Sequence, residues 1–205
     1  MRITLPALLL PLLLAACGGT TPTPGAGDVT VTVSDPDHGD TFSYQTTASF
    51  RPALGPQPGF PQSAAEKAML DAVNAERSRG GTCPDGQAFP ARAALTFEGH
   101  LHEAAARYGA VLAERGTTEL PHRIGTSTPA RRMVGAGFKP APPRGTVLRF
   151  EESLAAGMTD PAEVIAAWKG SVSHCAALYS PVSYGSVARA DGAGRAYWVL
   201  NTAGW

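Results

Sequence analysis

Cysteine, net charge and long apolar runs are all scarce in this sequence, and each shortage excludes a class of protein. Only three of the 205 residues are cysteine, so this is not a disulfide-dense scaffold. Basic and acidic side chains number 17 each, which gives no electrostatic reason to expect nucleic acid as a partner. The apolar run from Ile3 to Leu14 is too short to span a membrane as a stable helix.

The first residues instead have the pattern of an export signal. Arg2 supplies a positive end before the apolar run, and Leu14-Ala15-Ala16-Cys17 resembles a bacterial lipobox. That resemblance implies a signal peptide over residues 1–16 and a lipid on Cys17, which would attach the protein to a membrane. The predicted location is the cell envelope, at the outer membrane or the cell surface. The alternative is an ordinary secretory signal with a cysteine nearby.

Export also bears on the two remaining cysteines, Cys83 and Cys175. Exported proteins meet oxidising conditions, so two leftover cysteines are expected to form one disulfide. A disulfide between them also argues against either sulfur being a catalytic thiolate.

Composition divides the mature chain into a tether and a domain. Residues 17–62 are predicted to be the lipid anchor and a low-complexity tether, because glycine, threonine and proline cannot build a core. Alternating apolar residues within the tether fit two short strands, at 29–33 and 42–46. These strands either form a hairpin against the domain or stay disordered. The domain itself is predicted to cover residues 63–205.

Helix signals recur along the domain. A capping box at 63–66 begins the first helix, and the glycines at 80 and 81 end it. A second helix follows Leu95-Thr96 and ends at Gly116, and a third starts at Thr128-Pro129. Asp160-Pro161 starts a fourth, with Glu163 as the expected capping-box partner. A short fifth helix is expected from His174 to Leu178.

Strand signals lie mostly in the C-terminal half. Residues 147–152 alternate as a strand, and residues 184–190 and 195–202 flank a glycine-rich turn as a hairpin. Helices and strands do not alternate as βαβ units. The predicted class is therefore α+β, with helices packed on a small, mainly antiparallel sheet.

Several of these segments resemble, in order, the CAP superfamily (cysteine-rich secretory, antigen 5, pathogenesis-related 1; the SCP domain) in its short bacterial form. The matching pieces are residues 69–77, 95–97, His122, 128–138, 151–157, 162–175 and 197–199. The sequence departs from the family pattern at Glu151, Ser153 and Leu200, and Val172-Ser173 replaces the usual Pro-Gly. The resemblance covers about residues 65–202.

The resemblance implies an α-β-α sandwich whose cleft is lined by two histidines and two acidic residues. Carried over by position, these are His122, His174 and Glu152, with Glu163 as a doubtful fourth. Some family members bind zinc in this cleft, and two histidines with one carboxylate are suitable zinc ligands. The same groups without metal are suited to acid–base chemistry.

Three of these residues also have a plainer interpretation. Glu163 is explained by helix capping alone, His174 by packing next to the disulfide, and His122 by a surface turn. His100 and His102 stand two apart on a helix, so we expect them to diverge and to lie at the surface.

Three functions remain open from sequence. The first is a binding module for a metal, a small apolar ligand or an envelope protein. The second is a metal-assisted hydrolase of peptides or envelope polymers, with Glu152 as base. The third is a structural, disulfide-braced display domain. A serine hydrolase is disfavoured because the sequence has no Gly-x-Ser-x-Gly motif.

Overall fold

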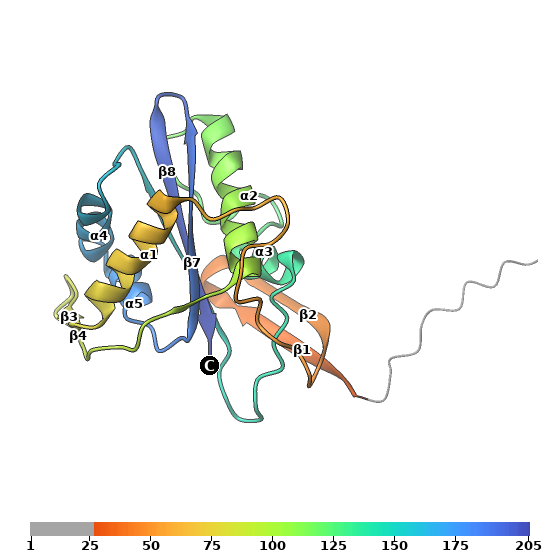
Figure 1. Ribbon diagram of the computed structural model, residues 1–205. Coiled ribbons are helices and arrows are strands. Elements are labelled where there is room, and N and C mark those ends of the chain that lie inside the picture. Colours follow the sequence, from red (N-terminus) through yellow and green to blue (C-terminus); the bar gives the residue numbers. More distant parts are fainter. Residues whose placement is uncertain (1–26) are drawn as a thin grey trace, which may run out of the picture.

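A four-stranded sheet at the centre of the protein separates two layers of helices (Figure 1). The computed structural model describes residues 27–205. The strands lie in the order β5-β7-β8-β6. Their bounds are β5 Thr96–Phe97, β6 Arg149–Ala156, β7 Tyr184–Gly192 and β8 Arg195–Gly204. Only β5 and β7 pair in parallel. The predicted α+β class with a mainly antiparallel sheet is confirmed.

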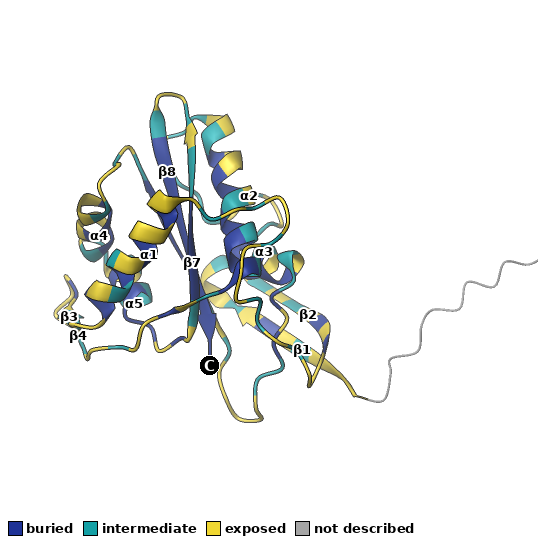
Figure 2. Cartoon of the chain, in the orientation of Figure 1, coloured by how far each residue is buried: buried dark blue, intermediate teal, exposed yellow. Residues whose placement is uncertain are grey.

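The helices divide between the two faces of this sheet. They are α1 Ala64–Arg77, α2 Gly99–Arg115, α3 Pro129–Ala136, α4 Pro161–Lys169 and α5 Val172–Leu178. Successive side chains of each strand point to opposite faces of the sheet. Val187 therefore packs with α1, α4 and α5, and Ala188 packs with α2. Burial is accordingly greatest along β8, between the layers (Figure 2).

Local sequence accounts for the helix boundaries. Ser63 Oγ accepts from the Glu66 N–H at 3.2 Å and Glu66 Oε2 from the Ser63 N–H at 2.6 Å, which is the predicted capping box. Thr128 caps α3 and Asp160 caps α4. Gly116 ends α2 in the left-handed conformation, with φ of 61°, which costs glycine little.

Several element ends differ from the sequence prediction, most clearly those of β6 and α5. β6 begins at Arg149, not at 147, and it continues to Ala156 because Ser153 to Ala156 pair with β8 as far as Tyr197. α5 begins at Val172, two residues before His174, because Ser171 caps it. The C-terminal extension of β6 and the earlier start of α5 lengthen elements that the short local pattern underestimated.

The N-terminal strands form a hairpin that packs on the domain, which decides between the two alternatives. β1 (Asp28–Asp35) and β2 (Asp40–Thr47) are joined by the turn η1 (Pro36–His38). Val33 and Tyr44 of the hairpin share an apolar cluster with α3. The Tyr44 hydroxyl donates to the Pro140 carbonyl at 2.6 Å, which fixes the position of the hairpin on the domain.

Two long-range links fix the chain around α5. The predicted disulfide joins Cys83, between β3 (Gly81–Thr82) and β4 (Ala88–Phe89), to Cys175 on α5. The buried guanidinium of Arg77 donates to three backbone carbonyls at the end of α5 and just beyond it, those of residues 178, 180 and 182. Burial lowers the pKa of Arg77 to about 10, which still leaves it charged at neutral pH.

The predicted signal peptide and Cys17 lie outside the described residues. Within residues 27–205, no helix combines the length and the apolar character needed to cross a membrane.

His102 corrects the expectation that the histidines of α2 lie at the surface. Its side chain is 1% exposed, because α2 is covered over a wide arc by the sheet and neighbouring segments. Its Nε2 lies 3.5 Å from Glu66 Oε2, and neither ring nitrogen has a hydrogen bond of full geometry. His100 is partly exposed, and its Nδ1 lies 2.7 Å from Glu98 Oε1.

The buried Glu66 carboxylate makes stability depend on pH. Burial alone would raise the pKa of Glu66, but His102 and the backbone N–H groups of Ser63 and Arg189 outweigh it and lower the pKa from 4.5 to about 2. A depressed folded-state pKa stabilises the protein above about pH 4.5, and this contribution is lost as pH falls toward 2.

We therefore expect Glu66→Gln to lower the free energy of unfolding at neutral pH by up to about 3 kcal/mol. The variant should also lose less stability than the wild type between pH 4.5 and 2. Urea unfolding at neutral pH and near pH 3 measures both effects, with Glu114→Gln as a control because Glu114 is exposed. Parallel acid dependence in wild type and Glu66→Gln would contradict the assignment.

Candidate functional site

His122 and His174 meet at the outer edge of the sheet, beside β6. His122 lies in the loop between α2 and α3, and His174 lies on α5, which covers the opposite face. Their Nε2 atoms are 3.3 Å apart and their ring centroids are 5.5 Å apart. Because β6 is the last strand of the sheet, elements from both layers can reach around it. The two predicted histidines are therefore brought together.

Glu152 of β6 contacts the His122 ring on the side opposite His174. Its Oε1 lies 2.9 Å from His122 Nδ1, and its side chain is only 1% exposed. Glu152 points to the α2 and α3 layer because it shares a strand face with Leu154. A carboxylate at Nδ1 favours the tautomer with the proton there, so the Nε2 lone pair faces His174.

Arg132 of α3 supplies the charge that a buried carboxylate requires. Its Nη2 donates to Glu152 Oε1 at 2.9 Å and Oε2 at 2.7 Å, and also to the His122 carbonyl at 3.0 Å. Its guanidinium carbon lies 3.5 Å from the centroid of the Tyr108 ring. One arginine thus neutralises Glu152 and fixes the backbone that carries His122.

The surroundings of His174 favour its neutral form. Burial lowers the pKa of His174, the neighbouring His122 lowers it further, and Glu152 acts weakly in the opposite direction. A neutral ring at neutral pH keeps a lone pair available to a metal ion or a proton.

The two Nε2 atoms fit a zinc ion, and Glu152 does not fit as a direct ligand. Nitrogens 2.0–2.1 Å from one tetrahedral zinc lie about 3.3 Å apart, the separation found here. The Glu152 oxygens are already bonded to His122 and Arg132, so Glu152 would support a ligand without being one. In residues 27–205 no three His, Cys, Asp or Glu side chains are already arranged to hold a metal ion.

Glu163, the doubtful second acid, lies away from the histidines. It is exposed on α4, which buries Val164, Ile165 and Trp168. Asp160 caps the helix by accepting from the Ala162 N–H at 2.8 Å. Glu163 is therefore an exposed side chain in the first turn of α4.

His38 is a residue near the site that the sequence analysis missed. Its ring centroid lies 5.9 Å from that of His122, and its Nδ1 lies 2.8 Å from Asp35 Oδ1. It comes from the turn of the N-terminal hairpin, within the segment predicted to be a tether. The only available signal was the alternating pattern of the flanking strands, which does not show where a hairpin docks.

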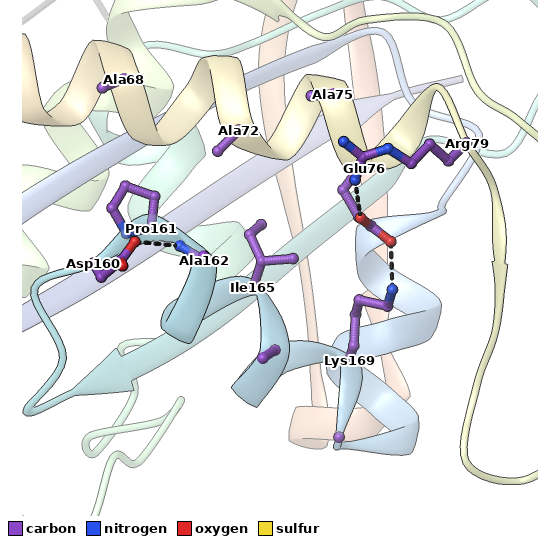
Figure 3. Close-up of a pocket in the computed structure, with 12 residues that line it drawn as sticks. Ala68, Ala72, Ala75, Glu76, Arg79, Asp160, Pro161, Ala162, Ile165 and Lys169 are labelled. Atoms are coloured by element: carbon purple, nitrogen blue, oxygen red, sulfur yellow. Dashed lines mark hydrogen bonds and ion pairs between the residues drawn. The ribbon is translucent and has the colours of Figure 1, made fainter.

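A separate groove lies between α1 and α4 (Figure 3). Its volume is about 850 Å³, and neither His122 nor His174 lines it. Small apolar side chains form its walls, with Ala68, Ala72 and Ala75 on α1 facing Ile165 on α4. The small alanine side chains leave the space between the two helices open.

One end of the groove is charged. Glu76 Oε1 lies 2.6 Å from Lys169 Nζ, and Glu76 Oε2 accepts from Arg79 at 3.0 Å (Figure 3). Burial would raise the pKa of Glu76, but its bonds to Lys169 and to the Tyr179 hydroxyl lower it overall. The groove therefore combines apolar walls with a polar end where Lys169 and Arg79 flank Glu76, and Asp160 adds a second carboxylate to the groove lining.

Comparisons with known proteins support the fold alone. No family model matches the sequence, and no curated protein matches it. Among solved structures, the fold is similar to that of an outer surface protein from Borrelia burgdorferi, with a TM-score of 0.51. The match covers 68% of this chain and 92% of that one, at 18% sequence identity.

The burial of Glu152 gives a test of the network. Arg132→Ala leaves a buried carboxylate without its guanidinium, so we expect unfolding free energy to fall by about 3–5 kcal/mol. Arg107→Ala is the control, because the Arg107 side chain is 64% exposed and its ion pair with Glu103 lies at the surface of α2, so its loss should cost much less. Chemical denaturation of both variants measures the difference, and equal losses would contradict this role for Arg132.

Proposed function

We propose that this protein is an exported, lipid-anchored component of the cell envelope with a CAP-type binding domain. The export signal and Cys17 support the location, and so does the fold shared with a protein named for the outer surface of a cell. The disulfide fits an oxidising compartment. The order of the sequence segments supports the CAP assignment.

The ligand favoured at the histidine pair is a divalent transition-metal ion such as zinc. The observation that carries this proposal is the 3.3 Å separation of two Nε2 atoms, with a carboxylate behind one ring. Imidazole is a good ligand for zinc, and a carboxylate at the far nitrogen orients the ring and raises its basicity. His122 and His174 would bind the metal, and Glu152 and Arg132 would position His122.

Calorimetric titration of the purified protein with Zn²⁺ tests this proposal. We expect one ion per chain. We also expect His122→Ala and His174→Ala each to weaken Zn²⁺ binding by more than roughly 10–100-fold, which is the loss typical when a residue that only hydrogen-bonds to a metal ligand is replaced. His100→Gln is the control, because His100 pairs with Glu98 away from the pair.

Two results would refute metal binding at this pair. One is a wild-type protein that takes up no Zn²⁺. The other is unchanged affinity in His122→Ala and His174→Ala. Circular dichroism of each variant establishes that a lost affinity does not reflect unfolding.

A second ligand class, small apolar molecules, is favoured by the groove between α1 and α4. A volume of about 850 Å³ with alanine and isoleucine walls suits an alkyl chain or a small ring system. Lys169 and Arg79 at the polar end would face an acidic group on such a ligand.

A fluorescent alkyl carboxylate tests the groove directly. Ala72→Phe fills the space between the helices, so we expect probe binding to fall at least tenfold. The matched control is Ala167→Phe, because Ala167 lies exposed on α4 outside the groove. Equal probe binding by both variants would place the ligand elsewhere.

The geometry gives less support to the other two functions. A hydrolase with Glu152 as general base requires an accessible carboxylate oxygen, but the Glu152 oxygens are buried and bonded to Arg132 and His122. A purely structural role leaves the facing histidines unexplained. Binding therefore remains the preferred function.

A further inference from the structure

A third histidine reaches the proposed metal site from outside the segments that carry the family resemblance. His38 lies in the turn between β1 and β2, and its ring centroid is 5.9 Å from that of His122. The corresponding separation between His122 and His174 is 5.5 Å. His38 therefore stands almost as close to the central ring as His174 does.

His38 is held in the same way as His122. Its Nδ1 lies 2.8 Å from Asp35 Oδ1 and 3.0 Å from Oδ2, as His122 Nδ1 lies 2.9 Å from Glu152 Oε1. A carboxylate at Nδ1 leaves Nε2 with a free lone pair. Both rings thus have the carboxylate support that is typical of metal-bound histidine.

Contacts on both sides of the turn fix the position of His38. Arg123, the residue after His122, donates to the His38 carbonyl. Asp40, two residues after His38, forms a two-point ion pair with Arg131 at 2.6 and 2.8 Å and also accepts from Thr128 at 2.9 Å. The turn is therefore tied to the His122 loop and to α3.

The surroundings of the turn attract cations. A cavity of about 290 Å³ between the hairpin and β6 is lined by Asp35, Asp37 and Glu151, among others. Burial raises the pKa of Glu151, while the Ser180 hydroxyl and Arg149, which also lines the cavity, lower it, and the negative charges of Asp37 and Asp35 raise it. A positive ion beside these carboxyl groups would lower their electrostatic repulsion.

We propose that His38 is the third protein ligand of a divalent transition-metal ion held by His122 and His174, so that metal binding fastens the N-terminal hairpin to the domain. This inference rests on the proposed metal site and adds a ligand from a separate element. Three histidines around one ion form a known zinc arrangement that leaves a fourth position open. Since no three ligands already converge in the described residues, metal binding requires the His38 side chain to rotate toward His122 while the backbone of the turn stays in place.

Cobalt substitution tests the ligand number. We expect Co²⁺ to give the visible absorption of a four-coordinate site in the wild type, and we expect His38→Ala to shift that spectrum and weaken binding by at least tenfold. Asp35→Asn keeps a capping oxygen for the turn, so it is the second variant, with an expected loss of about 10–100-fold. His100→Gln is again the control.

Hydrogen exchange of the hairpin provides a second measurement. Zn²⁺ should slow amide exchange in residues 28–47 of the wild type by at least tenfold, and should have no such effect in His38→Ala. Exchange without metal shows whether the variant hairpin is still docked. If the hairpin of His38→Ala is not docked, the metal affinity and hairpin exchange of Asp35→Asn decide whether His38 is a ligand.

The possible failures are distinguishable. Metal binding and spectra that are unchanged in both His38→Ala and Asp35→Asn overturn the role of His38 but leave the His122–His174 proposal intact. A wild type that binds neither Co²⁺ nor Zn²⁺ overturns both.

Discussion

The site depends on one buried charge, the Glu152 carboxylate on the edge strand β6. A carboxylate with 1% exposure is costly unless it is paired, and Arg132 pairs it through both oxygens. The pairing joins α3 to the sheet, and the same guanidinium holds the carbonyl of His122. The orientation of His122 toward His174 therefore follows from the neutralisation of Glu152.

The edge of the sheet explains how distant segments meet there. A central strand is covered on both sides, whereas β6 has a neighbour only in β8. The loop of His122 and helix α5 approach from opposite faces, and the N-terminal hairpin lies close to the same edge. The disulfide fixes α5 itself and Arg77 fixes its C-terminal end, so His174 is held at this edge.

Local patterns predicted much of the fold and less of the site. Capping residues and glycines marked the helix boundaries because their effects act within one turn, as at Ser63 and Gly116. Arg132 and His38 were missed because their roles arise from contacts 20 to 84 positions away in sequence. His102 was misjudged because spacing on a helix does not reveal how much of that helix is covered.

The protonation of His122 tests the account most directly. Long-range ¹H–¹⁵N correlation by nuclear magnetic resonance distinguishes the two tautomers of a histidine ring without any metal. The account predicts that the uncharged His122 ring carries its proton on Nδ1, facing Glu152, and has a bare Nε2 facing His174. A ring with its proton on Nε2 would contradict it, because no lone pair would then be turned toward His174.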